Sequence, residues 1–186
     1  MTATVKGNQI KITKEYITGI YGKDSIERLS GHIDAEYAEL ISQPVLDAAR
    51  APEEAFVQLL NAVHIVYGRS DYKVMREIGR YLAKQSISKF YRIFIQFGDP
   101  MFVVQRSGSF WRTIHNTGSM KFEAAGAKKA RGRLYEFPFP SKAFCSMLLG
   151  YFEGVIEMSG RKAVSSCETK CVVDGTGYCE YEVEWE

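Results

Sequence analysis

The sequence predicts an α+β fold in which N-terminal helices pack on an antiparallel sheet and a C-terminal helix is followed by a β-hairpin. Helical periodicity dominates up to residue 116, and alternation with a period of two replaces it after Gly118. The 186 residues are 46% hydrophobic and carry 24 basic and 22 acidic side chains, a balance that excludes a disordered or low-complexity chain. We expect an N-terminal arm or helical extension over residues 1–30 and one main domain over residues 31–186.

The first half of the chain is predicted to be mostly helical. Residues 1–12 are the exception, because their weak alternation around Gly7 predicts a small hairpin or an unstructured arm. Residues 51–54, Ala-Pro-Glu-Glu, predict the start of a helix, since proline and acidic residues favour the first turn. Apolar residues then recur at helical spacing until Gly68. A further helix is predicted from Asp99 to about residue 116.

Two hairpins and one strong helix are predicted in the second half. Residues 120–124 and 134–139 read as paired strands around a basic turn at 128–131, which is too short to indicate nucleic-acid binding. Ser141 opens the helix, and Gly150 and Gly154 within it predict a close approach of that helix to the sheet. The last hairpin is predicted from strands at 163–171 and 179–186; alternation in the second places Cys179, Tyr181, Val183 and Trp185 on one face.

The sequence lacks signals for export, for membrane insertion and for known catalytic motifs. It has no cationic and apolar leader and no apolar run long enough to cross a bilayer, so we expect a cytoplasmic protein. It also has no G-x-S-x-G elbow, P-loop, H-E-x-x-H motif or dinucleotide fingerprint, so we do not expect an enzyme. All four cysteines lie in the last quarter, which in a reducing compartment favours a metal site or free thiols over disulfides.

The C-terminal hairpin and the preceding helix are expected to bring thiols together. Cys171 and Cys179 lie on neighbouring antiparallel strands, and a helix packed on them can add Cys145. Thiolates are good Zn²⁺ ligands, and a carboxylate can complete the tetrahedron. The plainer alternative is a set of small buried thiols in a packed hairpin.

Three segments of this region resemble the 4-vinyl-reductase-like domain family: GYFEG at 150–154, ETKC at 168–171 and GYCEYEVEW at 177–185. The resemblance covers about residues 139–185. It implies a fold similar to haem nitric-oxide-binding domains and to transport-particle subunits, and a role as a small-molecule sensor that is often dimeric. In the phenol-sensing branch of bacterial activators, a structural zinc ion has Cys, Glu, Cys and Cys ligands. These are similar to Cys145, Glu168, Cys171 and Cys179 here.

Strand alternation complicates this ligand set. It places Glu168 on the face opposite Cys167 and Cys171, so the strand must bulge or end before Cys171 if Glu168 is to share the ion. Otherwise Cys167 is the substitute, although it lies about 13 Å from Cys171 along an extended strand. We therefore expect Glu168 as the ligand.

An apolar ligand cavity is expected between helix and sheet. Phe122, Leu149 and Phe152 match the region that encloses the ligand in the phenol-sensing branch, and Trp111 is placed to close the cavity. Ordinary core packing is the alternative for each of them. The sequence has no His–Trp pair suited to a phenolic hydroxyl, so phenol itself is not expected. His115, four residues after Trp111, is expected to stack on it.

Haem is not expected, because the Tyr-x-Ser-x-Arg motif of the haem-binding relatives is absent. The resulting hypothesis is a non-catalytic sensor module with a structural zinc ion. Its expected partners are a small apolar molecule, a second copy of the chain and a downstream signalling protein, without nucleic acid or a membrane span. The alternative hypothesis is a scaffolding or assembly protein similar to transport-particle subunits.

Overall fold

The computed structural model describes residues 2–68, 70–87 and 108–186. Most of the helix predicted from Asp99 lies outside these residues, and its end is helical at 108–114. The remaining elements are, in order, β1 (Thr4–Lys6), α1 (Gly7–Tyr21), η1 (Lys23–Ser25), η2 (Glu27–His32), α2 (Ala35–Ser42), β2 (Arg50–Pro52), α3 (Glu53–Tyr67), α4 (Lys73–Ser86), β3 (Ser119–Gly126), β4 (Lys129–Tyr135), α7 (Lys142–Met158), β5 (Ala163–Lys170), η3 (Val172–Asp174) and β6 (Cys179–Trp185).

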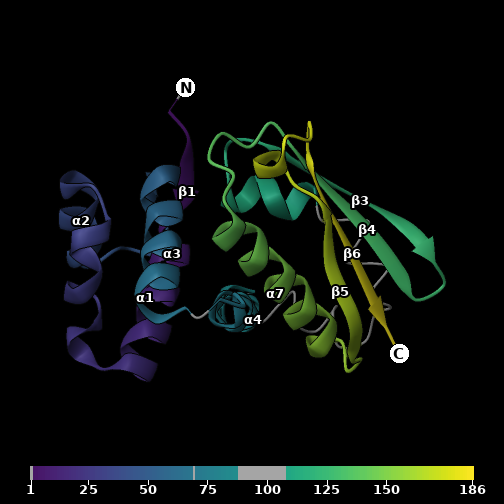
Figure 1. The fold of residues 1–186 in the computed structure, drawn as a ribbon, viewed down its shortest axis with the longest axis horizontal. Helices are drawn as coiled ribbons and strands as arrows, with labels where there is room; N and C mark the ends of the chain where they lie inside the picture. Colours follow the sequence, from purple (N-terminus) through teal and green to yellow (C-terminus); the bar gives the residue numbers. More distant parts are fainter. Residues whose placement is uncertain (1, 69, 88–107) are drawn as a thin grey trace.

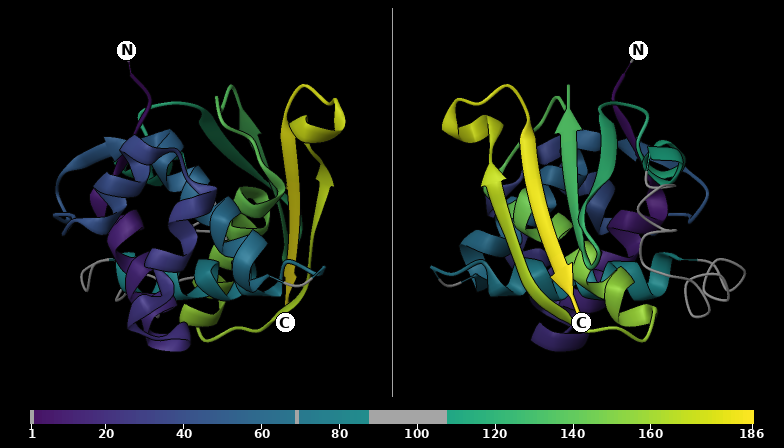
Figure 2. Two further views of the ribbon diagram at one scale, coloured as in Figure 1. Left: turned by 60° about the vertical axis from the view of Figure 1, so that its left-hand side comes forward. Right: turned by 90° about the vertical axis from the view of Figure 1, so that its right-hand side faces the viewer.

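A four-stranded antiparallel sheet forms one side of the molecule, and helices form the other. The strand order is β3-β4-β6-β5, which Figure 2 shows from the sheet side. Helix α7 lies directly against the sheet, α4 lies against α7, and α1, α2 and α3 form the side farthest from the strands (Figure 1). The predicted α+β class is confirmed, with α7 as the layer between the N-terminal helices and the sheet.

Helices α4 and α7 meet backbone to backbone. A Cβ atom added at Gly79 of α4 would lie 2.0 Å from the carbonyl oxygen of Met147, and one at Gly150 would lie 2.1 Å from that of Arg76. The expectation that Gly150 and Gly154 approach the sheet was therefore wrong: both face α4. Periodicity reveals a face of small residues but not the neighbour it meets.

A buried carboxylate reinforces this contact. Glu153 of α7 is 3% exposed. One of its oxygens lies 2.7 Å from the guanidinium of Arg76, and the other lies 2.7 Å from that of Arg80. Arg76 also donates hydrogen bonds to Ser166 of β5. These contacts join α4, α7 and the edge strand β5. They also give the buried charge of Glu153 the paired partners that it needs to be stable.

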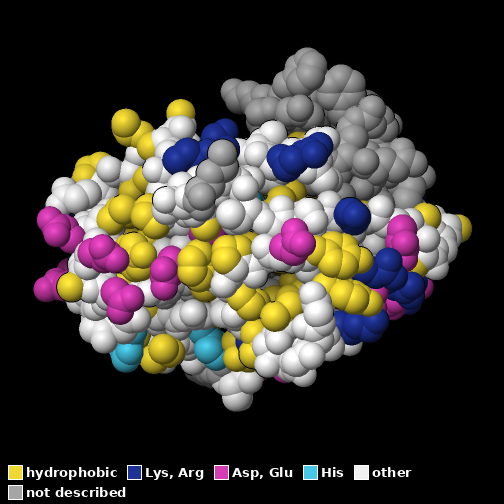
Figure 3. Space-filling view, turned by 90° about the horizontal axis from the view of Figure 1, so that it is seen from above, with side chains coloured by type: hydrophobic (Ala, Val, Ile, Leu, Met, Phe, Trp, Pro, Cys, Tyr) yellow, Lys and Arg dark blue, Asp and Glu magenta, His cyan; other side chains and the backbone are white. Residues whose placement is uncertain are grey.

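The two faces of β6 differ as predicted. Cys179, Tyr181, Val183 and Trp185 are all buried beneath α7. On the outer face, Arg131 and Arg133 of β4 pair with Glu182 and Glu180 of β6. Of the basic residues expected at the hairpin tip, Lys128 lies in the turn, whereas Lys129 and Arg131 lie within β4. Figure 3 shows basic side chains beside acidic ones at this side of the molecule.

The N-terminus is more ordered than the sequence predicted. Helix α1 begins at Gly7, where a side chain would meet the carbonyl oxygen of Leu46 at 2.4 Å. Strand β1 pairs with β2, and Ile10 and Ile17 are fully buried in the main core. The division of the chain at residue 30 stays a prediction. Among the described residues, no helix is long and apolar enough to cross a membrane.

Candidate functional site

Helix α7 and strand β6 carry two candidate sites along their contact. At one end lies the sulfur cluster, which consists of Cys145, Glu168, Cys171 and Cys179. Further along α7 lies the apolar pocket, a cavity of about 110 Å³ between α7, the sheet and residues 108–115. The same helix and strand therefore position both sites.

The sulfur cluster has the dimensions of a tetrahedral metal site. One ligand atom from each of the four residues lies within 4.8 Å of the others. The sulfur of Cys179 is 3.8 Å from that of Cys145 and 4.0 Å from that of Cys171. Zinc–sulfur bonds of about 2.3 Å at tetrahedral angles separate two sulfurs by about 3.8 Å, whereas a disulfide holds them at about 2 Å. The spacing fits thiols that share an ion.

Only one of the two carboxylate oxygens of Glu168 has a hydrogen-bond partner among the described residues. One of its oxygens accepts a hydrogen bond from Lys142 at 3.1 Å. The other oxygen is buried and has no hydrogen-bond partner in the part of the chain that the structure describes. A buried oxygen without a partner is costly unless it binds something, and a metal ion beside three thiols satisfies that need. The donor set of three thiols and one carboxylate therefore fits zinc.

The thiols differ in how readily they ionise. A hydrogen bond from Cys145 lowers the pKa of Cys179 to about 6. The same hydrogen bond raises the pKa of Cys145, and burial raises that of Cys171. Although burial lowers the pKa of Lys142, hydrogen bonds to Asp174 and Glu168 raise it overall, so Lys142 stays charged beside the cluster. Cys179 is therefore the thiol best prepared to bind a cation at neutral pH.

The path of β5 resolves the alternation problem. The register between β5 and β6 shifts between Glu168 and Lys170, and the strand ends before Cys171. This irregularity allows Glu168 and Cys171 to reach the same point. Cys167 is exposed and lies outside the cluster.

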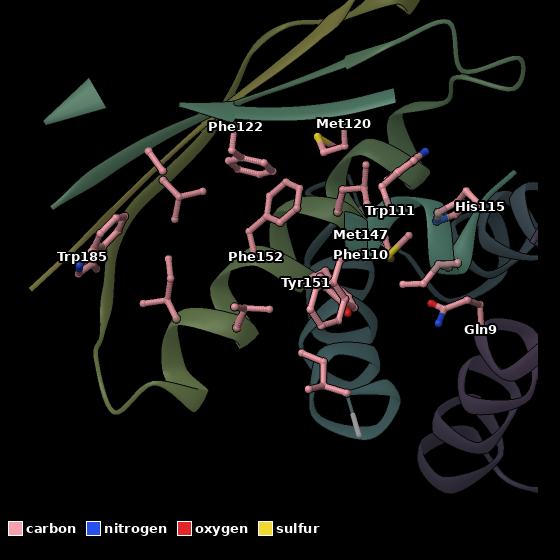
Figure 4. A pocket seen from close by; sticks show the side chains of 17 residues that line it. Gln9, Phe110, Trp111, His115, Met120, Phe122, Met147, Tyr151, Phe152 and Trp185 are labelled. Atoms are coloured by element: carbon pink, nitrogen blue, oxygen red, sulfur yellow. The ribbon is translucent and has the colours of Figure 1, made fainter. Parts of the chain in front are cut away.

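The apolar pocket brings together three of the four residues predicted to bind ligand. Trp111, Phe122 and Phe152 all line it, and the rings of Phe122 and Phe152 meet edge to face at 4.9 Å (Figure 4). Leu149 is buried but does not line the pocket, and the adjacent Leu148 does. Successive helical residues point about 100° apart, so only one of the two leucines faces the cavity.

Several wall residues were not predicted from the sequence. Gln9 of α1 lines the pocket although it lies in the segment expected to be a hairpin or arm. Trp185 lines it as well, so both tryptophans of the chain border the cavity. His115 stacks on Trp111 at 4.0 Å as predicted, and its ring is also part of the wall. The sequence indicated only the stacking, through the spacing of four residues between Trp111 and His115.

The comparisons with known proteins concern the fold. No protein-family profile matches this chain, and no curated protein matches its sequence. An H-NOX protein from S. oneidensis in its Fe(II)NO ligation state superposes with a TM-score of 0.72 at 15% identity, covering 97% of this chain and 99% of that one. The Fe(II) unliganded H-NOX protein from K. algicida gives a TM-score of 0.71 at 10% identity, covering 97% and 96%.

A third similar structure comes from work on haem distortion in the H-NOX family, with a TM-score of 0.69, 12% identity and coverage of 97% and 95%. The chain thus has the fold of H-NOX proteins over almost its whole length. This agrees with the fold relationship that the sequence resemblance implied. It runs against the expectation that haem is absent, because these neighbours are described with iron or haem.

Proposed function

We propose that this chain is a non-catalytic sensor module that binds a small apolar molecule between α7 and the sheet. The observation that carries the proposal is the apolar pocket itself. Its described walls are mostly aliphatic and aromatic side chains, including Trp111, Phe122 and Phe152. An apolar cavity of this kind binds apolar molecules rather than water. The likeness to H-NOX proteins supports the choice of a sensor over an enzyme.

The two tryptophans provide the test. Because Trp111 and Trp185 are the only tryptophans and both border the pocket, a ligand in the cavity changes the surroundings of every indole in the protein. We expect saturable changes in tryptophan emission on titration with a one-ring apolar molecule such as toluene. Calorimetry should give the same affinity. An emission spectrum and a heat signal that do not respond would contradict the proposal.

We further propose that Cys145, Glu168, Cys171 and Cys179 hold a structural zinc ion. Four protein ligands would fill a tetrahedral site and leave no open position for a substrate. The ion would link the start of α7 to both strands of the last hairpin. Metal analysis of protein purified without added zinc should find about one equivalent. A stably folded sample without metal would contradict this proposal.

Haem is the second candidate ligand, because the similar structures are described with iron or haem. The described part of the pocket does not fit it. A cavity of about 110 Å³ is small for a macrocycle, and pockets for ligands of that size measure roughly 300 Å³ or more. No Lys or Arg is among the described wall residues to pair with carboxylates. An absorption spectrum of protein expressed with ample haem decides: a Soret band would favour haem.

The output of the sensor is proposed to pass through protein contacts. We expect a homodimer and a separate signalling partner, as the sequence resemblance implies. The alternative remains an assembly protein similar to transport-particle subunits. Size-exclusion chromatography with and without toluene separates the two. Assembly that changes with the ligand supports the sensor, and stable assembly that ignores it supports scaffolding.

A further inference from the structure

The apolar pocket has one polar end. Figure 4 shows Gln9 and His115 on the same side of the cavity, opposite Trp185. Two other polar groups of the described wall, those of Trp111 and Tyr151, already have partners within the protein. The indole nitrogen of Trp111 donates to the carbonyl oxygen of Thr117 at 2.9 Å, and the hydroxyl of Tyr151 lies 3.4 Å from that of Ser86. Gln9 and His115 are therefore the groups best placed to recognise a polar atom of a ligand.

A buried carboxylate fixes the orientation of His115. Both oxygens of Glu53 lie close to the Nδ1 atom of His115, at 2.9 and 3.1 Å. Glu53 is fully buried and is the first residue of α3, where the helix N-terminus stabilises a negative charge. Because an ionised carboxylate only accepts hydrogen bonds, Nδ1 carries the hydrogen and donates it. The Nε2 atom then carries no hydrogen and can accept one.

Ring contacts hold the imidazole in place. One face stacks on Trp111, and the rings of Phe137 and Phe144 meet His115 edge to face at 6.2 and 6.1 Å. Among the described residues, no hydrogen bond involves Nε2. The side chain of Gln9 is 3% exposed, and its nitrogen donates to Asn8, which leaves its carbonyl oxygen as an acceptor. Such a fixed nitrogen in an apolar wall is suited to select one polar group of a ligand.

We infer that the pocket binds a small apolar alcohol whose hydroxyl group hydrogen-bonds to Nε2 of His115, with the Gln9 amide beside it. This inference rests on the proposed function, because it names the ligand class of the same pocket. A hydroxyl donates to neutral imidazole and accepts from protonated imidazole, so it fits both forms. A carboxylate would add a second negative charge near Glu53, and a hydrocarbon would leave the polar groups without partners.

The cavity sets the size of this ligand. Its volume of about 110 Å³ is somewhat below that of an apolar cavity of about 150 Å³ that holds benzene. One ring or a short chain is therefore the expected scale. Toluene, benzyl alcohol and benzoate form a matched set of probes, because they share a ring and differ in the polar group.

The test is a titration of the full chain with these three probes, followed by tryptophan emission and calorimetry. We expect benzyl alcohol to bind about tenfold more tightly than toluene, the effect of one buried hydrogen bond, and more tightly than benzoate. The Gln9→Leu variant should reduce this preference. The paired His115→Phe and Glu53→Leu variant should remove it, because no imidazole nitrogen is left there to bond the hydroxyl group. Met120→Leu, an apolar change in the same wall, is the control and should keep the preference.

The outcomes separate this inference from the proposed function. Equal binding of toluene and benzyl alcohol, or tightest binding of benzoate, overturns the alcohol assignment but leaves the pocket as a binding site. Failure of all three probes to bind overturns both. If the paired variant does not fold, Gln9→Leu carries the test, and an unchanged preference in that variant removes Gln9 from the assignment.

Discussion

The sulfur cluster and the apolar pocket share a helix and a strand, yet they are built in opposite ways. In the cluster, the ligand atoms of four side chains lie within 4.8 Å of one another, so the loss of any one of them disrupts the whole site. In the pocket, many side chains from α1, α7, the sheet and residues 108–115 each contribute a small area. Metal binding concentrates free energy in a few bonds, whereas apolar binding spreads it over a surface. Substitutions should therefore act very differently in the two regions.

The largest effect is expected from Cys179→Ala. This change removes the central thiol of the sulfur cluster, the one that lies within 4.0 Å of both other sulfurs. Zinc affinity should fall by more than about a hundredfold, because a tetrahedral site cannot replace a missing thiolate. Competition with a chromophoric chelator measures it. Cys167→Ser, at the exposed cysteine outside the cluster, is the control, and an equal loss in both variants would contradict the assignment.

A smaller effect is expected from Ala130→Leu, which fills the apolar pocket from β4. Ala130 is buried and lines the cavity. The added carbons should raise the free energy of unfolding by about 1 kcal/mol and weaken toluene binding at least tenfold. Urea denaturation and calorimetry measure the two changes.

Ala62→Leu is the matched control for the pocket. Ala62 is equally buried in α3 but does not line the cavity. Overpacking there should destabilise the protein by roughly 1–3 kcal/mol. Destabilisation of the same size in both variants would show that no usable cavity exists at Ala130.

The smallest effect is expected on the outer face of the same strands. A hydrogen bond from Arg133 lowers the pKa of Glu180. The stability that this carboxylate contributes is therefore complete above its unfolded pKa near 4.5 and is lost as the pH falls through the lower folded value. Glu180→Gln should cost about 1 kcal/mol or less at pH 7. Urea denaturation at pH 7 and pH 3 should show this difference shrinking, and a constant difference would contradict the pairing.

The two regions also differ in how far the sequence predicts them. Cys145, Cys171 and Cys179 stand out because thiols are rare and because their strands are adjacent, so their convergence follows from the hairpin. The polar end of the pocket gave no such signal. His115 and Glu53 are 62 residues apart, and only the tertiary fold joins them. Each alone resembles an ordinary residue at a helix terminus.

The errors in the predicted fold have a similar origin. Alternation around Gly7 suggested a hairpin, but Ile10 and Ile17 satisfy a helical face once α1 packs into the core. The basic residues near Arg131 suggested an exposed turn because their partners Glu180 and Glu182 lie about fifty positions further along the chain. Local patterns predicted which elements form, and the choice of neighbours depended on contacts that local patterns do not contain.

The close contact between α4 and α7 determines which wall of the pocket can move when a ligand binds. With Gly79 and Gly150 pressed against opposing carbonyl groups and Glu153 clamped by two guanidinium groups, α7 has no room to slide or tilt toward α4. An arriving molecule that needs extra space must obtain it from side chains or from the strand side, where β3 is an edge strand with mostly exposed side chains. A structural change caused by a ligand in the cavity would then be transmitted through the sheet rather than through the helices behind α7.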